Sequence, residues 1–227
     1  MDTRQLQSRL RAKGYDLIVD GEMGPKTFAA LLSAVGMQRL CTMHYDLGRA
    51  AVSHFSAHSI NTPLRLTHFL AQSCVETRGF TVLVENLNYS AKRLTEVWPA
   101  RFPNIAAAAP FAHNPQALAN KTYGGRFGNN STGDGWKYRG RGTKQTTFKD
   151  NYAEVEKVTG LPVVNQPDML AEPDTGMRAG CIYWSERDCA ALADADNILA
   201  ITRRVNGGTN GLQLRIAARN RAAQILM

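Results

Sequence analysis

The sequence predicts a mainly α-helical fold, and three observations support that prediction. From Met37 onward, apolar residues recur at helical spacing while strand signals are weak. Proline and glycine stand where helices would begin and end, as at Pro25 and Gly36. Hydrophobic residues make up 44% of the 227 residues, which is enough for a large buried core.

The first 36 residues form a small helical segment of their own. Leu6 and Leu10 are apolar among polar neighbours, and they predict a short helix that begins near Thr3 and ends at Gly14. A turn at 20–21 then leads into a second helix from residue 25 to about residue 35. We therefore divide the chain into a segment over residues 1–36 and a main domain over residues 37–227.

The main domain is expected to be a succession of helices with one long irregular stretch. Helices are predicted at residues 64–77, from residue 91 until Pro99, and at 151–159, 175–186, 196–205 and 212–226. The stretch from Pro110 to Tyr138 is rich in Asn, Gly and Thr and predicts a long loop region. Loops of that length within a compact domain tend to be functional.

The chain is basic, with 27 Lys and Arg against 19 Asp and Glu and a net charge of +8. Such a charge favours polyanionic partners, which include nucleic acid, an anionic membrane and a bacterial cell wall. The basic residues are scattered, so an ordinary solvated surface explains them equally well. No nucleic-acid-binding motif is recognisable, and we expect no nucleic-acid partner.

Cysteine and histidine usage gives no metal site. The four cysteines form no C-x-x-C pair and the five histidines are dispersed, so we expect reduced thiols, no metal and no organic cofactor. The polar N-terminus lacks a secretory apolar stretch, and no run approaches 18 apolar residues. These features lead us to expect synthesis in a cytoplasm without a signal peptide.

Glu76 is the first of two candidate catalytic carboxyls. It shares one helical face with Phe69, Gln72 and Ser73, because the four residues follow the i, i+3, i+4, i+7 spacing. A carboxyl beside apolar side chains loses hydration, and that favours the protonated form that a general acid requires. The alternative is a last-turn glutamate that only caps the helix or pairs with Arg78.

Glu85, nine residues further on, is the second candidate. On a continuous helix it would point away from Glu76 and lie roughly 13 Å further along. Gly79 predicts that the helix ends between them, which places Glu85 on a loop where its carboxylate stays solvated and ionised. Two carboxyls in contrasting environments are typical of glycoside hydrolysis, although many proteins carry two glutamates at this spacing.

The N-terminal segment resembles the peptidoglycan-binding-domain-1 pattern. The matching residues are Leu6-Gln7, Leu10, Gly14-Tyr15, Val19-Asp20-Gly21, Gly24 and Thr27. The resemblance covers about 30 residues and implies wall binding, but this segment is shorter than the usual module. Either the module is truncated, or residues 37–55 serve both it and the main domain. A helical hairpin that simply packs on the main domain is the alternative.

Three segments of the main domain together resemble glycoside hydrolase family 19, most closely its bacteriophage endolysin branch. They are PLRLTHFLAQSCVETRGF (63–80), YRGRGTKQTTFKDNY (138–152) and RRVNGGTNGL (203–212). The resemblance implies a lysozyme-like helical catalytic domain. It also implies that Glu76 is the general acid, that Glu85 is the general base and that Thr147 helps to hold the attacking water.

The same resemblance implies substrate contacts from Gln145 and Asn206, with Tyr138 and Arg141 lining or bracing the cleft. Arg141 pairing with a structural acid is an open alternative. The sequence departs from the family at Val75, Arg78, Lys144 and Thr146, none of which has a catalytic role in the family. The last three departures suggest a cleft surface altered toward an anionic glycan.

The activity implied is inverting hydrolysis of β-1,4 bonds in peptidoglycan by a monomeric phage endolysin. It would accumulate in the host cytoplasm until a holin opens the membrane. The basic C-terminal helix either contacts an outer membrane or closes the core. Two further functions stay open: a chitinase that uses the same glutamates, and a non-catalytic wall-binding protein.

Overall fold

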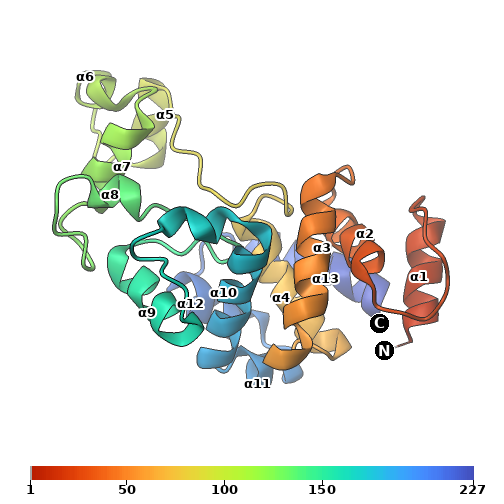
Figure 1. Cartoon of the computed structure of the whole chain (residues 1–227). Coiled ribbons are helices and arrows are strands. Elements are labelled where there is room, and N and C mark those ends of the chain that lie inside the picture. Colours follow the sequence, from red (N-terminus) through yellow and green to blue (C-terminus); the bar gives the residue numbers. More distant parts are fainter. Residues whose placement is uncertain (1) are drawn as a thin grey trace. The chain divides into compact units, whose positions relative to one another are not determined.

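The computed structural model describes residues 2–227, and nearly every regular element in that range is a helix. The predicted mainly α-helical class is therefore confirmed. The chain forms two compact units (Figure 1). Unit 1 contains residues 2–83, 142–145 and 169–227, and unit 2 contains residues 84–141 and 146–168.

Unit 1 is built around helix α4, Pro63–Glu76, which packs against α2, α11, α12 and α13. Its other helices are α1 (Thr3–Ala12), α2 (Pro25–Gly36), α3 (Thr42–His54), α10 (Pro173–Glu186), α11 (Cys189–Asp194), α12 (Ile198–Asn206) and α13 (Leu212–Leu226), with a 3-10 turn at Ser56–His58. A chain of edge-to-face rings, Phe28–Phe55–Phe69–Trp184, runs through the core and joins α2, α4 and α10. The core thereby fixes the position of α4.

The N-terminal segment is part of this core. Leu6 and Leu10 are buried in the same apolar cluster as α4 and α13. At the end of α2, a Cβ on Gly36 would stand 2.5 Å from the carbonyl oxygen of Gly79, so only glycine permits the two backbones to approach so closely. The predicted helices over this segment are confirmed, with ends at Ala12 and Gly36. Its proposed role in wall binding stays a prediction.

Unit 2 has a smaller apolar core of its own, formed by Leu87, Leu94, Phe102, Ala108, Leu118 and Ala119. Its helices are α5 (Ala91–Val97), α6 (Ile105–Ala108), α7 (Pro115–Tyr123), α8 (Asp134–Lys137) and α9 (Lys149–Thr159), with a 3-10 turn at Ala109–Phe111. Figure 1 shows α5 to α8 gathered in the olive-yellow to green part of the chain. A further 3-10 turn, Pro167–Ala171, spans the boundary between the units.

Two sequence predictions need correction here. The expected long loop over 110–138 contains helix α7, which Asn114 caps by accepting a hydrogen bond from Ala117 N. Asn114-Pro115 is a typical helix start, but the Gly-rich composition of the residues that follow led to the prediction of a loop. The expected helix over 196–205 is present as α12, Ile198–Asn206, but the separate helix α11 that precedes it was not predicted.

The C-terminal helix α13 buries Arg215, Ala218, Ala222, Ile225 and Leu226, and it packs against α4 and α2. This arrangement fits the core-closing alternative. Within residues 2–227, no helix combines the length and apolar character needed to cross a membrane. All four cysteines are free thiols, and Cys74 is buried.

Candidate active site

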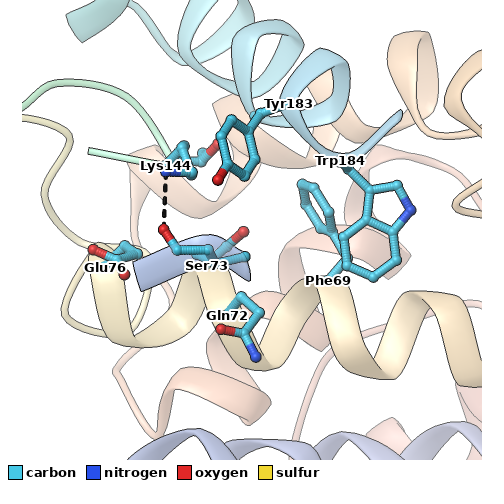
Figure 2. Close-up of a pocket in the computed structure, with 10 residues that line it drawn as sticks. Phe69, Gln72, Ser73, Glu76, Lys144, Tyr183 and Trp184 are labelled. Carbon is cyan, nitrogen blue, oxygen red and sulfur yellow. Dashed lines mark hydrogen bonds between the residues drawn. The ribbon is translucent and has the colours of Figure 1, made fainter. Parts of the chain in front are cut away.

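Glu76 is the last residue of α4, and the helical face predicted from its spacing is the one observed. Thr62 begins the helix by accepting a hydrogen bond from Arg65 N, and Pro63 occupies its first turn. Phe69, Gln72, Ser73 and Glu76 all line one small cavity of about 20 Å³ (Figure 2). That volume holds about one water molecule.

The immediate partner of Glu76 is a cation. Arg215, from the first turn of α13, is 1% exposed and its Nη2 lies 2.5 Å from Glu76 Oε1. Its Nη1 donates 2.7 Å to Gln72 Oε1, so one guanidinium holds two residues of the same face. Glu76 therefore lies beside apolar side chains, as expected, but a buried cation that was not expected contacts it as well. The carboxylate pairs with Arg215 and not with Arg78, the alternative partner.

A second cation, Lys144, lines the same cavity. Its Nζ donates to the carbonyl oxygen of Val205 at 3.1 Å, the bond drawn dashed from Lys144 in Figure 2, and it stands 3.8 Å from the centre of the Tyr183 ring. Burial lowers the pKa of Lys144, while the nearby charge of Glu76 opposes that shift. Two cations, Arg215 and Lys144, therefore interact with the one carboxylate of Glu76.

The chain turns sharply after Glu76. Arg78, Gly79 and Phe80 all have positive φ angles, of 51°, 75° and 64°. The Thr77 hydroxyl stabilises the turn by donating to Ser73 O and accepting from Phe80 N. The predicted helix break is confirmed, and Glu85 follows outside any helix.

In unit 2, Glu85 is held by neutral donors. Tyr123 Oη donates to one carboxylate oxygen at 2.8 Å, and the backbone N–H of Gly140 donates to the other at 2.5 Å. The Glu85 backbone N–H in turn donates to Gly140 O at 3.0 Å. Burial raises the pKa of Tyr123 and the charge of Glu85 adds to that rise, so the phenol keeps its proton.

Tyr138 and Arg141 are buried in unit 2, each 1% exposed. Tyr138 donates to Val164 O, and Arg141 forms an ion pair of 2.6 Å with Asp168 while donating to the Tyr152 hydroxyl. Arg141 does pair with a structural acid, as one sequence alternative held. The burial of both side chains favours bracing over direct contact with a glycan.

The other predicted residues lie in different surroundings. Thr147 is partly buried in unit 2, where its carbonyl accepts a hydrogen bond from Asn151 Nδ2. Gln145, in unit 1, has a φ of 55° and donates to Gly142 O. Asn206 is the exposed last residue of α12. Their assigned roles, in holding water or substrate, stay predictions.

Sequence reasoning missed Arg215 and Tyr123. Arg215 lies 139 residues after Glu76, and Tyr123 lies 38 residues after Glu85. No local spacing links such positions. The sequence offers one signal for Arg215, which is a basic residue on an otherwise apolar helix face in LQLRIAARN. Such a residue is rarely buried without a partner, so it could have suggested a buried ion pair.

No group of three or more His, Cys, Asp or Glu residues capable of holding a metal occurs among residues 2–227. His68 Nε2 lies 2.7 Å from Asp196 Oδ1, so this histidine has a carboxylate partner within the protein.

Comparison with known proteins shows which proteins this chain resembles. No protein-family model matches it. A protein of Haemophilus influenzae described as containing a glycosyl hydrolase family 19 domain is 40% identical over 149 residues, which are 65% of this chain and 72% of the relative. An endochitinase of Arabidopsis thaliana is 36% identical over 75 residues, which are 33% of this chain and 26% of that enzyme.

Solved structures agree on the fold. Chitinase C from Streptomyces griseus superimposes with a TM-score of 0.62 at 18% identity, covering 91% of this chain and 95% of that one. A bacterial family 19 chitinase gives a TM-score of 0.57 at 22% identity, covering 87% and 93%. The chain belongs to glycosyl hydrolase family 19 and is a glycoside hydrolase with the lysozyme-like fold of that family. Its substrate is a polysaccharide.

Proposed function

We propose that this enzyme hydrolyses β-1,4 glycosidic bonds of bacterial peptidoglycan by an inverting mechanism, as a phage endolysin. The observation that carries the proposal is the contrast between its two candidate carboxylates. Glu76 is paired with a cation beside a water-sized cavity, whereas Glu85 is held by a phenol and a backbone amide. Groups held in such different ways suit different roles in acid–base chemistry.

In the proposed reaction, Glu76 donates a proton to the leaving oxygen as the glycosidic bond breaks. Glu85 removes a proton from a water molecule, held in part by Thr147, which attacks the anomeric carbon from the opposite face. The product then has inverted configuration. Such a reaction requires carboxyl groups roughly 6.5–9.5 Å apart, a distance that a crystal structure with a bound glycan fragment would measure.

Peptidoglycan is favoured over chitin by charge. The protein carries a net charge of +8. Peptidoglycan strands carry carboxylates, whereas chitin is neutral, so a basic protein is attracted electrostatically only to the former. The N-terminal resemblance to a wall-binding pattern points the same way.

Chitin is the second candidate substrate, because the Arabidopsis relative and both structural neighbours are chitinases by name. Rates on purified peptidoglycan and on soluble chitin oligomers, measured with one preparation, separate the two. Faster cleavage of chitin oligomers would overturn the peptidoglycan proposal while leaving the carboxylate roles intact.

The decisive experiment compares wild type with Glu76→Gln and Glu85→Gln. Each variant should lose about 10²- to 10⁴-fold in the rate of peptidoglycan clearing, because each removes a proton-transfer group. Glu186→Gln is the matched control, since Glu186 is also the last residue of a helix but is exposed. NMR of the first-formed anomer tests inversion, and clearing that survives both substitutions would contradict the assigned roles.

The endolysin role is tested in cells. Expression with a holin should lyse the host, and expression without one should not, because the enzyme would then remain separated from the wall. Contact of α13 with an outer membrane has less support, since Ala218, Ala222, Ile225 and Leu226 of this helix are buried. A monomer is the expected form, which light scattering would measure.

A further inference from the structure

Phe127 is an exposed aromatic ring in an unusual backbone conformation. The residue is 60% exposed, and its φ angle is 42°. A single exposed apolar side chain is ordinary, but a bulky residue with positive φ is rare and carries a conformational cost. Strain of this kind persists where the surrounding structure enforces it, and it often marks a functional position.

The loop around Phe127 is fixed by hydrogen bonds to the end of α7 and to the start of α9. Asp150 N donates to Phe127 O, and buried Asn129 both donates to Tyr123 O and accepts from Lys149 N. A Cβ on Gly128 would stand 2.2 Å from an Asp150 carboxylate oxygen, so the backbone is pressed against the start of α9. These contacts hold the Phe127 ring outward in one place.

The ring is also continuous with the environment of Glu85. Phe127 packs edge-on against Phe148 with ring centres 5.0 Å apart, and Phe148 packs against Tyr123 at 5.4 Å. Tyr123 donates its hydroxyl to Glu85. All of these residues belong to unit 2, so the exposed ring lies two aromatic contacts away from the residue that holds the proposed base.

A cation accompanies the ring. The guanidinium of the exposed residue Arg126 lies 5.6 Å from the centre of Phe127 and 5.3 Å from that of Phe148. Its Nη1 donates a long hydrogen bond of 3.4 Å to Thr122 O. An apolar face with a neighbouring guanidinium complements a ligand that has both a flat apolar face and a carboxylate.

We propose that Phe127 and Arg126 form a binding subsite for the glycan strand in unit 2. Phe127 stacks on the apolar face of an N-acetylated sugar ring, and Arg126 binds a carboxylate substituent of the same strand. This inference rests on the proposed function, because carboxylate substituents occur on peptidoglycan and not on chitin. It adds a site for sugars other than the two that are joined by the bond that is cut.

Binding is measured by calorimetry on full-length protein carrying Glu85→Gln, which prevents turnover. The probes are a neutral N-acetylglucosamine hexamer and a peptidoglycan glycan fragment of equal length that retains its lactyl carboxylates. Phe127→Leu keeps an apolar side chain but lacks a flat ring, and it should weaken binding of both probes roughly three- to tenfold. Phe127→Trp should retain binding.

Arg126→Gln should weaken binding of the acidic fragment alone, and added salt should reduce that effect. Two exposed residues of the same unit serve as controls, Val158→Ala for the apolar change and Lys121→Gln for the charge. Circular dichroism and the thermal midpoint verify that each variant is folded.

Unchanged affinity of Phe127→Leu for both probes would overturn the subsite. If wild type cuts only chitin oligomers, the peptidoglycan proposal and the role of Arg126 fail. The loss in Phe127→Leu on the neutral hexamer would still support the stacking role. If wild type bound neither probe, the stacking role of Phe127 and the carboxylate-binding role of Arg126 would both be overturned.

Discussion

Glu76 and Glu85 are the same residue type in two different settings. Glu76 ends a helix of the larger unit and is held by a buried guanidinium from the C-terminal helix. Glu85 lies on an irregular segment of the smaller unit and is held by a phenol and an amide from within that unit. Glu76 is held by a charged group from a helix that packs on the core, and Glu85 is held by neutral hydrogen-bond donors of its own unit.

This difference has an energetic consequence. A buried guanidinium that loses its carboxylate, or a carboxylate that loses its guanidinium, is left as an uncompensated charge. A carboxylate that loses one neutral donor can still be hydrated. Substitutions around Glu76 should therefore lower the free energy of unfolding of unit 1. Substitutions around Glu85 should mainly lower the catalytic rate and leave stability largely unchanged.

The largest effect is expected from Arg215→Met. The Arg215 side chain is 2% exposed and that of Glu76 is 18% exposed, so the substitution leaves a largely buried carboxylate without its partner. We expect a loss of about 3–5 kcal/mol in the free energy of unfolding, measured by urea denaturation. Adding Glu76→Gln to this variant should restore part of the loss. A double variant no more stable than Arg215→Met would show that packing, rather than charge, sets the effect.

A smaller effect is expected from Tyr123→Phe. The ring can stay packed against Phe148, so the change removes only the hydrogen bond to Glu85. A hydrogen bond to a charged group contributes about 1.5–3 kcal/mol. If that is lost in the transition state, the rate of peptidoglycan clearing should fall roughly ten- to hundredfold.

Tyr152→Phe is the control for Tyr123→Phe, because Tyr152 is also buried in unit 2 but makes its hydrogen bonds to Arg141 and Arg139 O. Equal losses of activity in the two variants would argue that Tyr123 acts through the stability of the unit and not through Glu85.

The smallest effect is expected from Lys144→Met, and its signature is pH dependence. Burial lowers the pKa of Lys144 in the folded state below its unfolded value of about 10.4. Between these two values the unfolded chain binds more protons, so this lysine makes folding more favourable as pH rises through that window. The stability of wild type relative to Lys144→Met should rise toward about pH 10.4 and be flat below the window.

Thermal midpoints of wild type and Lys144→Met across that range provide the measurement. Other titrating groups are common to both proteins and cancel in the difference. Parallel curves would contradict the assigned burial of the ammonium group.

Much of the local structure could be predicted from the sequence. The spacing of Phe69, Gln72, Ser73 and Glu76 predicted one face of α4, and those four residues line one cavity. Gly79 predicted the turn that follows. Capping residues and periodicity act within one or two helical turns, so neighbouring residues contain that information. The α7 start at Asn114-Pro115 was equally local and was missed because the residues that follow it are rich in Gly and Asn.

The electrostatic setting of the site was decided only by tertiary structure. By itself, the sequence determined a helical chain with two carboxyls on either side of a glycine turn. Folding brought Arg215 to Glu76 from 139 residues away, Tyr123 to Glu85 from 38 residues away and Lys144 into the cavity beside Glu76. Charge and burial act through space, so the partners of a buried carboxylate depend on how distant helices pack and not on the residues beside it in the chain.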